Sequence, residues 1–306
     1  MKNNKYEIDM CNGTLMDKLI SFSLPLMLSG ILQLLFNAVD IIVVGRFTGS
    51  QALAAVGSTT ALINIFTNLF IGISLGANVL AARFYASGKE KEMSETVHTS
   101  ITLALISGLV MALAGVLLAR FALNLMGTPN DVIDQSVLYM RIYFLGMPFF
   151  MLYNYGAAIL RAVGDTKRPL FFLVISGMTN AVLNLVLVIV FHMGVAGVAI
   201  GTIVSQLISS ILVLRCLYTS NTSYRLYFSK LGIKTQYLKQ IFQVGIPAGI
   251  QSTVINLSNA LLQSSVNSFG SGPKKYAPQP RVSATPTERI IQSRSTLSIL
   301  FSSFTP

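Results

Sequence analysis

The chain has 306 residues, of which 53% are hydrophobic and only 11% are charged. Soluble globular domains carry about 25% charged residues, so this composition excludes an ordinary soluble enzyme and a disordered or collagen-like chain. The net charge of +11 would suggest a nucleic-acid partner in a soluble protein. Here the charges fall in short connections between long apolar runs, which is typical of a protein embedded in the lipid bilayer and predicts no nucleic-acid partner.

Seven apolar segments are long enough to cross a bilayer, because a spanning helix needs about 20 mostly apolar residues. The fourth and the seventh of them are the most polar. Together they predict an all-α integral membrane fold. In chain order the segments lie near 19–44, 53–80, 99–119, 135–159, 169–192, 195–218 and 238–266.

Lys and Arg are concentrated in alternate connections. The N-terminal arm and the connections after the second, fourth and sixth segments are basic, whereas the other connections hold only Arg46 and Arg120. Cytoplasmic loops carry the excess of basic residues in membrane proteins. The chain is therefore expected to have its N-terminus in the cytoplasm.

The seventh segment resembles the first, which indicates an internal repeat. Pro25 is echoed by Pro247, and an asparagine follows twelve residues later in each case, at Asn37 and Asn259. From Ser271 onward the chain becomes rich in proline and serine. The prolines forbid a regular helix, and the change in composition suggests a frameshift or a truncated gene.

These observations predict the organisation of the chain. We expect a cytoplasmic arm over 1–18, a six-helix lobe over 19–218, a cytoplasmic linker over 219–237, the first helix of an incomplete second lobe over 238–270, and a disordered, non-native tail over 271–306.

Polar residues recur at helical spacing inside five of the segments. Polar groups that face lipid are costly, so such stripes either form hydrogen bonds between helices or line a water-filled cavity. Five stripes together favour a shared cavity for a small-molecule substrate. The residues predicted to line it are Gln33, Asn37, Asn64, Asn68, Gln206 and Asn259.

Asp40 is the only acidic residue well inside a segment. A carboxylate in hydrocarbon costs at least ~2.5 kcal/mol, so it is expected to bind a cation, take up a proton, or pair with a base such as Arg46. The helical rise places Asn180, Asn184 and Thr202 at a depth similar to that of Asp40. Their oxygen atoms suit a hard ion such as Na⁺ or a hydrogen-bonded proton.

Pro25 lies in the first segment, on the cytoplasmic side of Asp40. Proline removes one helical hydrogen bond and tends to kink a helix. Pro25 is therefore a candidate hinge, or alternatively a static packing feature.

Several short motifs resemble one family of membrane proteins. The stretches 37–46, 52–57, 125–129, 139–146 and 158–167 are similar, in order, to sequences of the multidrug and toxic compound extrusion (MATE) transporters. The resemblance covers about residues 14–270.

This resemblance implies two six-helix lobes that form a cation-coupled antiporter of the bacterial inner membrane, which exports organic cations and other drugs in exchange for H⁺ or Na⁺. It implies no cofactor besides the coupling ion. It also places Asp40, Asn180, Asn184 and Thr202 at the positions of the family's cation site. Asn184 stands where an aspartate is usual in one branch of the family, so a cation would be held by less negative charge.

Three alternatives remain from the sequence. A lipid or polysaccharide flippase would share many helices and a polar interior, but it would favour a more basic cavity than Arg141 alone provides. A membrane prenyltransferase would need clustered aspartates for Mg²⁺, which are absent from the sequence. A chain with one lobe and a single further helix would transport nothing by itself if two lobes must rock against each other.

Overall fold

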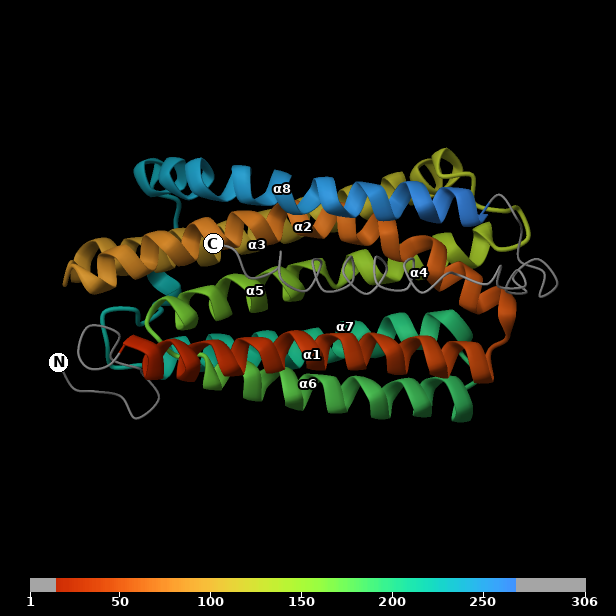
Figure 1. The fold of residues 1–306 in the computed structure, drawn as a ribbon, viewed down its shortest axis with the longest axis horizontal. Helices are drawn as coiled ribbons and strands as arrows, with labels where there is room; N and C mark the ends of the chain where they lie inside the picture. The colour runs from red at the N-terminus through yellow and green to blue at the C-terminus, as the bar shows by residue number, and fades with distance from the viewer. Residues whose placement is uncertain (1–14, 268–306) are drawn as a thin grey trace, which may run out of the picture. The chain divides into compact units, whose positions relative to one another are not determined.

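The computed structural model describes the backbone of residues 15–267 and the side chains of residues 16–60 and 62–254 (Figure 1). The predicted tail over 271–306 and most of the predicted arm lie outside these residues. Within them the regular structure is helical. The elements are α1 (Leu15–Phe47), α2 (Ser50–Ala86), α3 (Glu90–Leu125), α4 (Ile133–Leu145), α5 (Met147–Ala162), α6 (Lys167–Leu185), the π-helical turn η1 (Val186–Val190), α7 (Gly194–Thr219), the short η2 (Phe228–Lys230) and α8 (Thr235–Asn267).

The helices α1, α2, α3, α6 with η1, and α7 are each long and apolar enough to cross a membrane, and the bent pair α4–α5 meets the same criterion when the two helices are taken together. Many of their apolar side chains remain outside the bundle: Leu34 is 71% exposed and Leu125 is 79% exposed. Apolar surface on this scale needs lipid as its solvent. The chain is therefore a multi-pass membrane protein. The predicted seventh span, α8, is long enough to cross a membrane but is not among the helices that are also apolar enough. Gln and Ser residues interrupt its apolar run.

The fourth segment differs from its prediction as one helix over 135–159. It consists of α4 and α5, which meet at Gly146 with a bend of 48°. Pro148 has no backbone N–H to donate to the carbonyl of Phe144, and its ring clashes with a straight helix at that point. The amide of Gly146 bonds instead to the carbonyl of Tyr143, in a tighter turn.

Two groups of helices surround α5 in Figure 1. The helices α1, α6 and α7 pack together on one side, and α2 packs against α8 and α3 on the other; α5 contacts α2, α3 and α7. Its large side chains form the centre of the core, with Met147, Met151 and Tyr155 fully buried. The helix α1 packs directly against α6 and α7, and α5 joins this group to α2 and α3.

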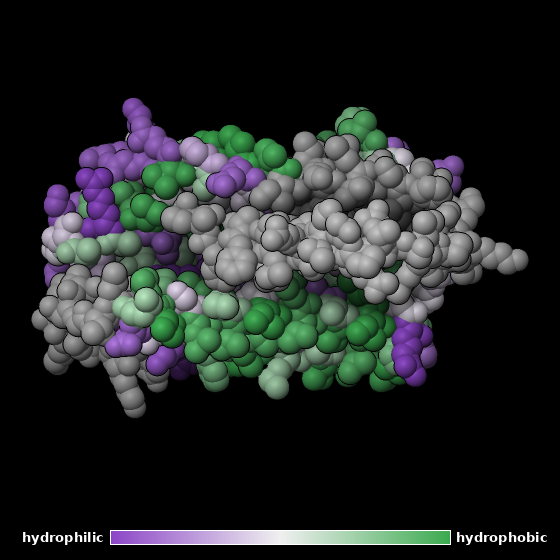
Figure 2. All heavy atoms as spheres, in the orientation of Figure 1, coloured by the Kyte–Doolittle hydropathy of each residue, from purple (hydrophilic) through white to green (hydrophobic). Residues whose placement is uncertain are grey.

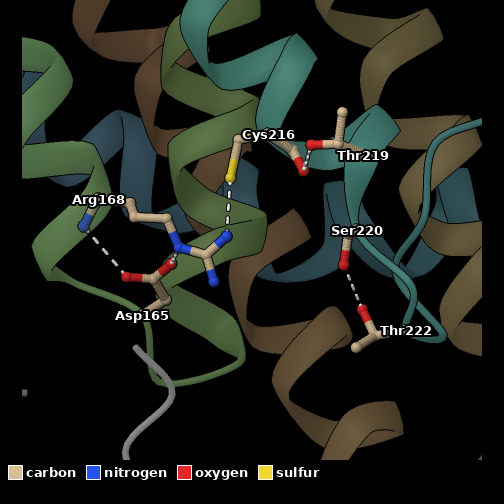
Figure 3. Close-up of polar contacts among 6 residues, drawn as sticks. All are labelled: Asp165, Arg168, Cys216, Thr219, Ser220 and Thr222. Carbon is tan, nitrogen blue, oxygen red and sulfur yellow. Dashed lines mark hydrogen bonds and ion pairs between the residues drawn. The ribbon is translucent and has the colours of Figure 1, made fainter. Parts of the chain in front are cut away.

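The turn between α5 and α6 is tied to the end of α7 by a buried ion pair (Figure 3). The carboxylate of Asp165 is fully buried and lies 2.5 Å from Nε of Arg168, and it also accepts a hydrogen bond from the backbone N–H of Arg168. Nη1 of the same guanidinium points to the sulfur of Cys216 on α7, at 3.1 Å. One arginine thereby links the start of α6 to the last turns of α7 at one end of the bundle.

The polar side chains gather at the end of the helices where α2 ends and α8 begins. Figure 2 shows hydrophilic residues there and hydrophobic residues along the middle of the visible face. The connection from α7 to α8 lies at this end and covers residues 220–234, slightly shorter than the predicted linker 219–237.

Candidate functional site

Four side chains from α1, α6 and α7 form one hydrogen-bonded cluster. Nδ2 of Asn184 donates to Oδ1 of Asp40 at 2.5 Å and to Oδ1 of Asn180 at 3.3 Å. Nδ2 of Asn180 in turn reaches Oγ1 of Thr202 at 3.4 Å. We call these four residues the Asp40 cluster. The sequence placed them at one depth, and the fold brings them into contact.

The cluster lies in the interior of the bundle. Asn180 and Asn184 are buried, and Asp40 and Thr202 are half-buried. None of the ion pairs within the described part of the chain involves Asp40 or Arg46, so the salt bridge considered from the sequence is not formed. The carboxylate is instead compensated by the amide of Asn184. A hydrogen bond to an ionised acceptor is among the stronger kinds.

Local structure explains how α6 and α7 present these groups. Asn180 and Asn184 are one turn apart on α6, directly before the π-helical turn η1, where the sequence predicted an uninterrupted helix to residue 192. Such turns are rare and occur often at functional sites. On α7 the hydroxyl of Thr202 also donates to the carbonyl of Val198 at 3.0 Å, which holds its oxygen toward Asn180.

Two tyrosines of α4 belong to the same site, and the sequence analysis missed them as site residues. Tyr139 and Tyr143 stack with ring centroids 6.0 Å apart. Asp40 lies within electrostatic reach of both hydroxyl groups, and the Gln206 side chain of α7 lies beside the last turn of α4 at Gly146. Their spacing of one helical turn was a usable signal, but only the bend after Leu145 decides which way α4 faces.

The remaining predicted cavity residues are spread over several elements. Gln33 and Asn37 are exposed on α1, on the same helical face as Asp40. Asn64 and Asn68 are half-buried on α2, where Nδ2 of Asn68 donates to the carbonyl of Asn64. The side chain of Asn259 lies outside the described residues. Gln206 lies one helical turn from Thr202 on α7, as Asn37 lies one turn from Asp40 on α1. The shared cavity stays a prediction.

Pro25 lies inside α1, and the helix continues through it from Leu15 to Phe47. Its side chain is buried, and its carbonyl accepts a hydrogen bond from the hydroxyl of Ser29 at 2.8 Å. The proline is thus held on both sides by regular helix. Its role as a hinge stays a prediction.

A bundle of membrane-spanning helices with a buried polar cluster around one carboxylate defines the class of multi-pass membrane proteins built to handle a polar solute. Comparison with known proteins agrees with this class. The family model described as MatE matches residues 25–186, which is more than half of the chain. The chain belongs to the MatE family of multidrug efflux transporters.

Individual relatives agree with the family. The chain is 34% identical over 259 residues to "Probable multidrug resistance protein YoeA" and 29% identical over 262 residues to "Probable multidrug resistance protein YpnP", both of Bacillus subtilis (strain 168). These matches cover 82% and 86% of this chain but 56% and 58% of the relatives. The chain thus spans little more than half the length of the curated relatives it matches.

The fold matches that of solved structures. An outward-facing MATE family multidrug resistance transporter of the MOP superfamily superposes with a TM-score of 0.78 at 23% identity, over 89% of this chain and 60% of that protein. The similarity supports the arrangement of helices described above. The curated relatives are named as multidrug resistance and multidrug export proteins, which is consistent with a family of transporters.

Proposed function

We propose that this chain contributes the ion-coupling site of a secondary active transporter that exports organic cations and other drugs in exchange for H⁺ or Na⁺. One observation carries the proposal: a single carboxylate, Asp40, lies in a membrane-spanning helix and accepts a hydrogen bond from Asn184, which is linked in turn to Asn180 and Thr202. A group of this kind in a span is costly unless it has a partner. The names of the relatives as multidrug proteins support drugs as the exported substrates.

The donor atoms of the Asp40 cluster suit a small hard cation or a proton. Carboxylate, amide and hydroxyl oxygens are the ligands that such cations prefer, and the four residues offer all three. In the arrangement described, the Asn184 amide donates its hydrogens to the carboxylate and to Asn180, while its own oxygen accepts no hydrogen bond among the described residues. A cation would displace this donor, and a turn of the amide would present the oxygen in its place.

Occupation of the site would change how α1 is held against α6. The hydrogen bond from Asn184 to Asp40 joins these two helices, and a bound ion would replace it with oxygen contacts. We propose that α1 responds near Pro25, where one backbone hydrogen bond is missing. An ion shifts a conformational equilibrium only if it binds one conformation more tightly than the other, and a change in the contact between α1 and α6 would provide that difference.

The substrate would meet the polar face of α1 beside the cluster. Gln33 and Asn37 are exposed there, and Asn64, Asn68, Gln206 and Asn259 are proposed to contribute from other helices. The proposed setting is the bacterial inner membrane, with the N-terminus in the cytoplasm, as the distribution of Lys and Arg predicts.

The test is cation-dependent stability of the purified chain. We expect Na⁺, or a proton when Na⁺ is absent, to raise the free energy of unfolding by about 2.7 kcal/mol at a concentration 100 times its dissociation constant. Asp40→Asn should abolish this gain, because the only acidic group of the cluster is lost. Thermal unfolding in NaCl and in choline chloride at equal ionic strength, over a range of pH, measures the gain and separates the two ions.

Asp131→Asn is the matched control, because Asp131 is exposed in the connection between α3 and α4. This variant should keep the full gain. Ethidium efflux from cells that express the chain tests transport separately. A cation-dependent gain that survives Asp40→Asn unchanged would refute the site, whatever the efflux result.

A further inference from the structure

A groove of about 520 Å³ lies between the last turns of α2 and the first turns of α8, beside the start of α3. It includes no residue of the Asp40 cluster. Its outer part is polar, with Arg83 and Lys89 on one wall and Gln236 and Gln240 on the other. Further along the helices the lining is mainly apolar, with Val79 and Leu80 of α2 and Val244 of α8 beside Gln243.

Polarity changes in the same direction along both walls. On α2, Val79 lies one helical turn deeper than Arg83, and Leu75 lies one turn deeper again. On α8, Val244 lies one turn deeper than Gln240. The side chains of Val79 and Val244 are 50% and 43% exposed, so this apolar strip is open to a ligand. A molecule with a polar end and an apolar end fits the groove in one orientation.

The polar end of the groove is basic. Residues 166–287 contain no Asp or Glu, so the wall formed by α8 carries no acid. Glu92 of α3 lines the groove beside Arg83 and Lys89, and Glu95 interacts with Tyr237 in the same groove. The segments that meet here, 83–95 and 234–240, hold five basic and three acidic residues. The balance is positive, and the guanidinium and ammonium groups are the usual partners of a phosphate.

The groove has a basic end and an apolar strip, and it lies on α2, a helix long and apolar enough to cross the bilayer. A membrane phospholipid has the same two parts, a charged head group and an acyl chain. Basic pockets between membrane helices bind lipid head groups in this way. A free phosphate would leave the apolar strip unused, and a zwitterionic lipid would gain nothing from the positive balance. The strip continues along α2 toward the bilayer interior, as an acyl chain does.

We propose that this groove binds an anionic glycerophospholipid such as phosphatidylglycerol. Arg83 and Lys89 hold the phosphate. The glutamine amides and Glu92 bond to the head-group hydroxyls. One acyl chain lies along Val79 and Val244. The lipid thereby joins α2 to α8, and the proposal is independent of the transport function.

The absence of tryptophan from the chain provides a direct test. Val79→Trp places a single fluorophore in the groove, and Val244→Trp places one on the opposite wall in case the first variant misfolds. The protein is reconstituted in nanodiscs that contain brominated phosphatidylglycerol, phosphatidylethanolamine or phosphatidylcholine, and quenching reports which lipid contacts the tryptophan. We expect phosphatidylglycerol to quench with about a five-fold preference over phosphatidylcholine, the effect of one basic residue near an anionic head group.

Two comparisons make the test decisive. Arg83→Gln with Lys89→Gln should remove the preference, and Phe171→Trp, an exposed position near the start of α6, should show no preference in either background. The proposal is overturned if phosphatidylcholine or phosphatidylethanolamine quenches as well as phosphatidylglycerol. It is also overturned if the double substitution leaves the preference intact, or if inorganic phosphate alone suppresses it.

Discussion

Asn184 is the residue that connects the Asp40 cluster. Its amide nitrogen donates to Asp40 on α1 and to Asn180 on its own helix. Its oxygen is buried directly against Gly201 of α7, and a Cβ atom at Gly201 would collide with it. The Asn184 amide can therefore occupy this position only because residue 201 of the neighbouring helix is a glycine, which has no side chain.

Gly201→Ala tests this dependence. The added methyl group must push the Asn184 amide away, and overpacking of this kind costs about 1–3 kcal/mol. We expect a lower melting temperature together with loss of the cation-dependent gain in stability, both measured by thermal unfolding. Gly30→Ala on α1 is the control, because a Cβ atom there meets nothing within 4 Å. Equal behaviour of the two variants would contradict the role of Gly201.

The connection from α7 to α8 is fastened to α3 by His98. Nδ1 of His98 faces the carbonyl of Ser94 at 2.6 Å, and Nε2 accepts the backbone N–H of Tyr227 at 3.0 Å, so the neutral Nδ1–H form fits this geometry. The Tyr227 ring also stacks on the imidazole and lies within 5.2 Å of the charged groups of Arg225 and Lys230. In the sequence, His98 lies directly before the third apolar segment, 99–119.

His98→Phe should loosen this connection. It keeps an aromatic ring beside Tyr227 but removes both hydrogen bonds, and a hydrogen bond contributes about 0.5–1.5 kcal/mol. We expect trypsin to cleave after Arg225 and Lys230 several times faster, measured by the rate of fragment formation. His192→Phe, in the exposed turn before α7, should leave the rate unchanged. No acceleration in the His98 variant would show that other contacts hold the segment.

The bend between α4 and α5 explains why the site contains tyrosines. The interruption at Pro148 lets α5 pack in the centre of the core while α4 turns independently. Tyr139 and Tyr143 then approach Asp40 and Gln206. One proline thus decides the composition of a site on three other helices.

Across the whole bundle, α8 is held mainly by α2. The two backbones approach so closely at Gly76 that a Cβ atom there would collide with the carbonyl oxygen of Ile241 and lie 2.9 Å from the amide nitrogen of Gly245. Small residues permit this approach between membrane helices. The Asp40 cluster contains no residue of α8, so the two regions can be disturbed separately.

Gly76→Ala should weaken the attachment of α8 by about 1–3 kcal/mol, because backbone atoms cannot move aside as side chains do. We expect a lower melting temperature and loss of the phosphatidylglycerol preference in the groove, but an unchanged cation-dependent gain in stability. Gly57→Ala, also on α2 but with nothing within 4 Å of a Cβ atom, is the control. Loss of the cation effect in the Gly76 variant would contradict the independence of the two regions.

Much of the architecture could be predicted from the sequence, because hydrophobic length and helical spacing are local properties. The boundaries of α1, α2 and α7 follow the predicted segments closely, and the depth of Asp40 relative to Asn184 follows from counting residues along two helices. The π-helical turn after Leu185, the break at Gly146 and the buried state of His98 were not predicted. The burial of His98 depends on contacts between segments distant in the chain. The break at Gly146 had a local signal in Pro148, which was not used.

The sequence by itself determined that the chain lies in a membrane, which family it resembles, and which residues carry the polar chemistry. Composition and periodicity encode these properties without reference to neighbours. Only the tertiary structure decided that Asp40, Asn184 and Thr202 belong to one hydrogen-bonded cluster. It also decided that the asparagines of α2 bond within their own helix, and that α2 and α8 enclose a basic groove beside Arg83. The physical reason is that the apolar length of a segment decides whether it forms a helix in lipid. Which helices then pack together depends on close packing and on hydrogen bonds between them.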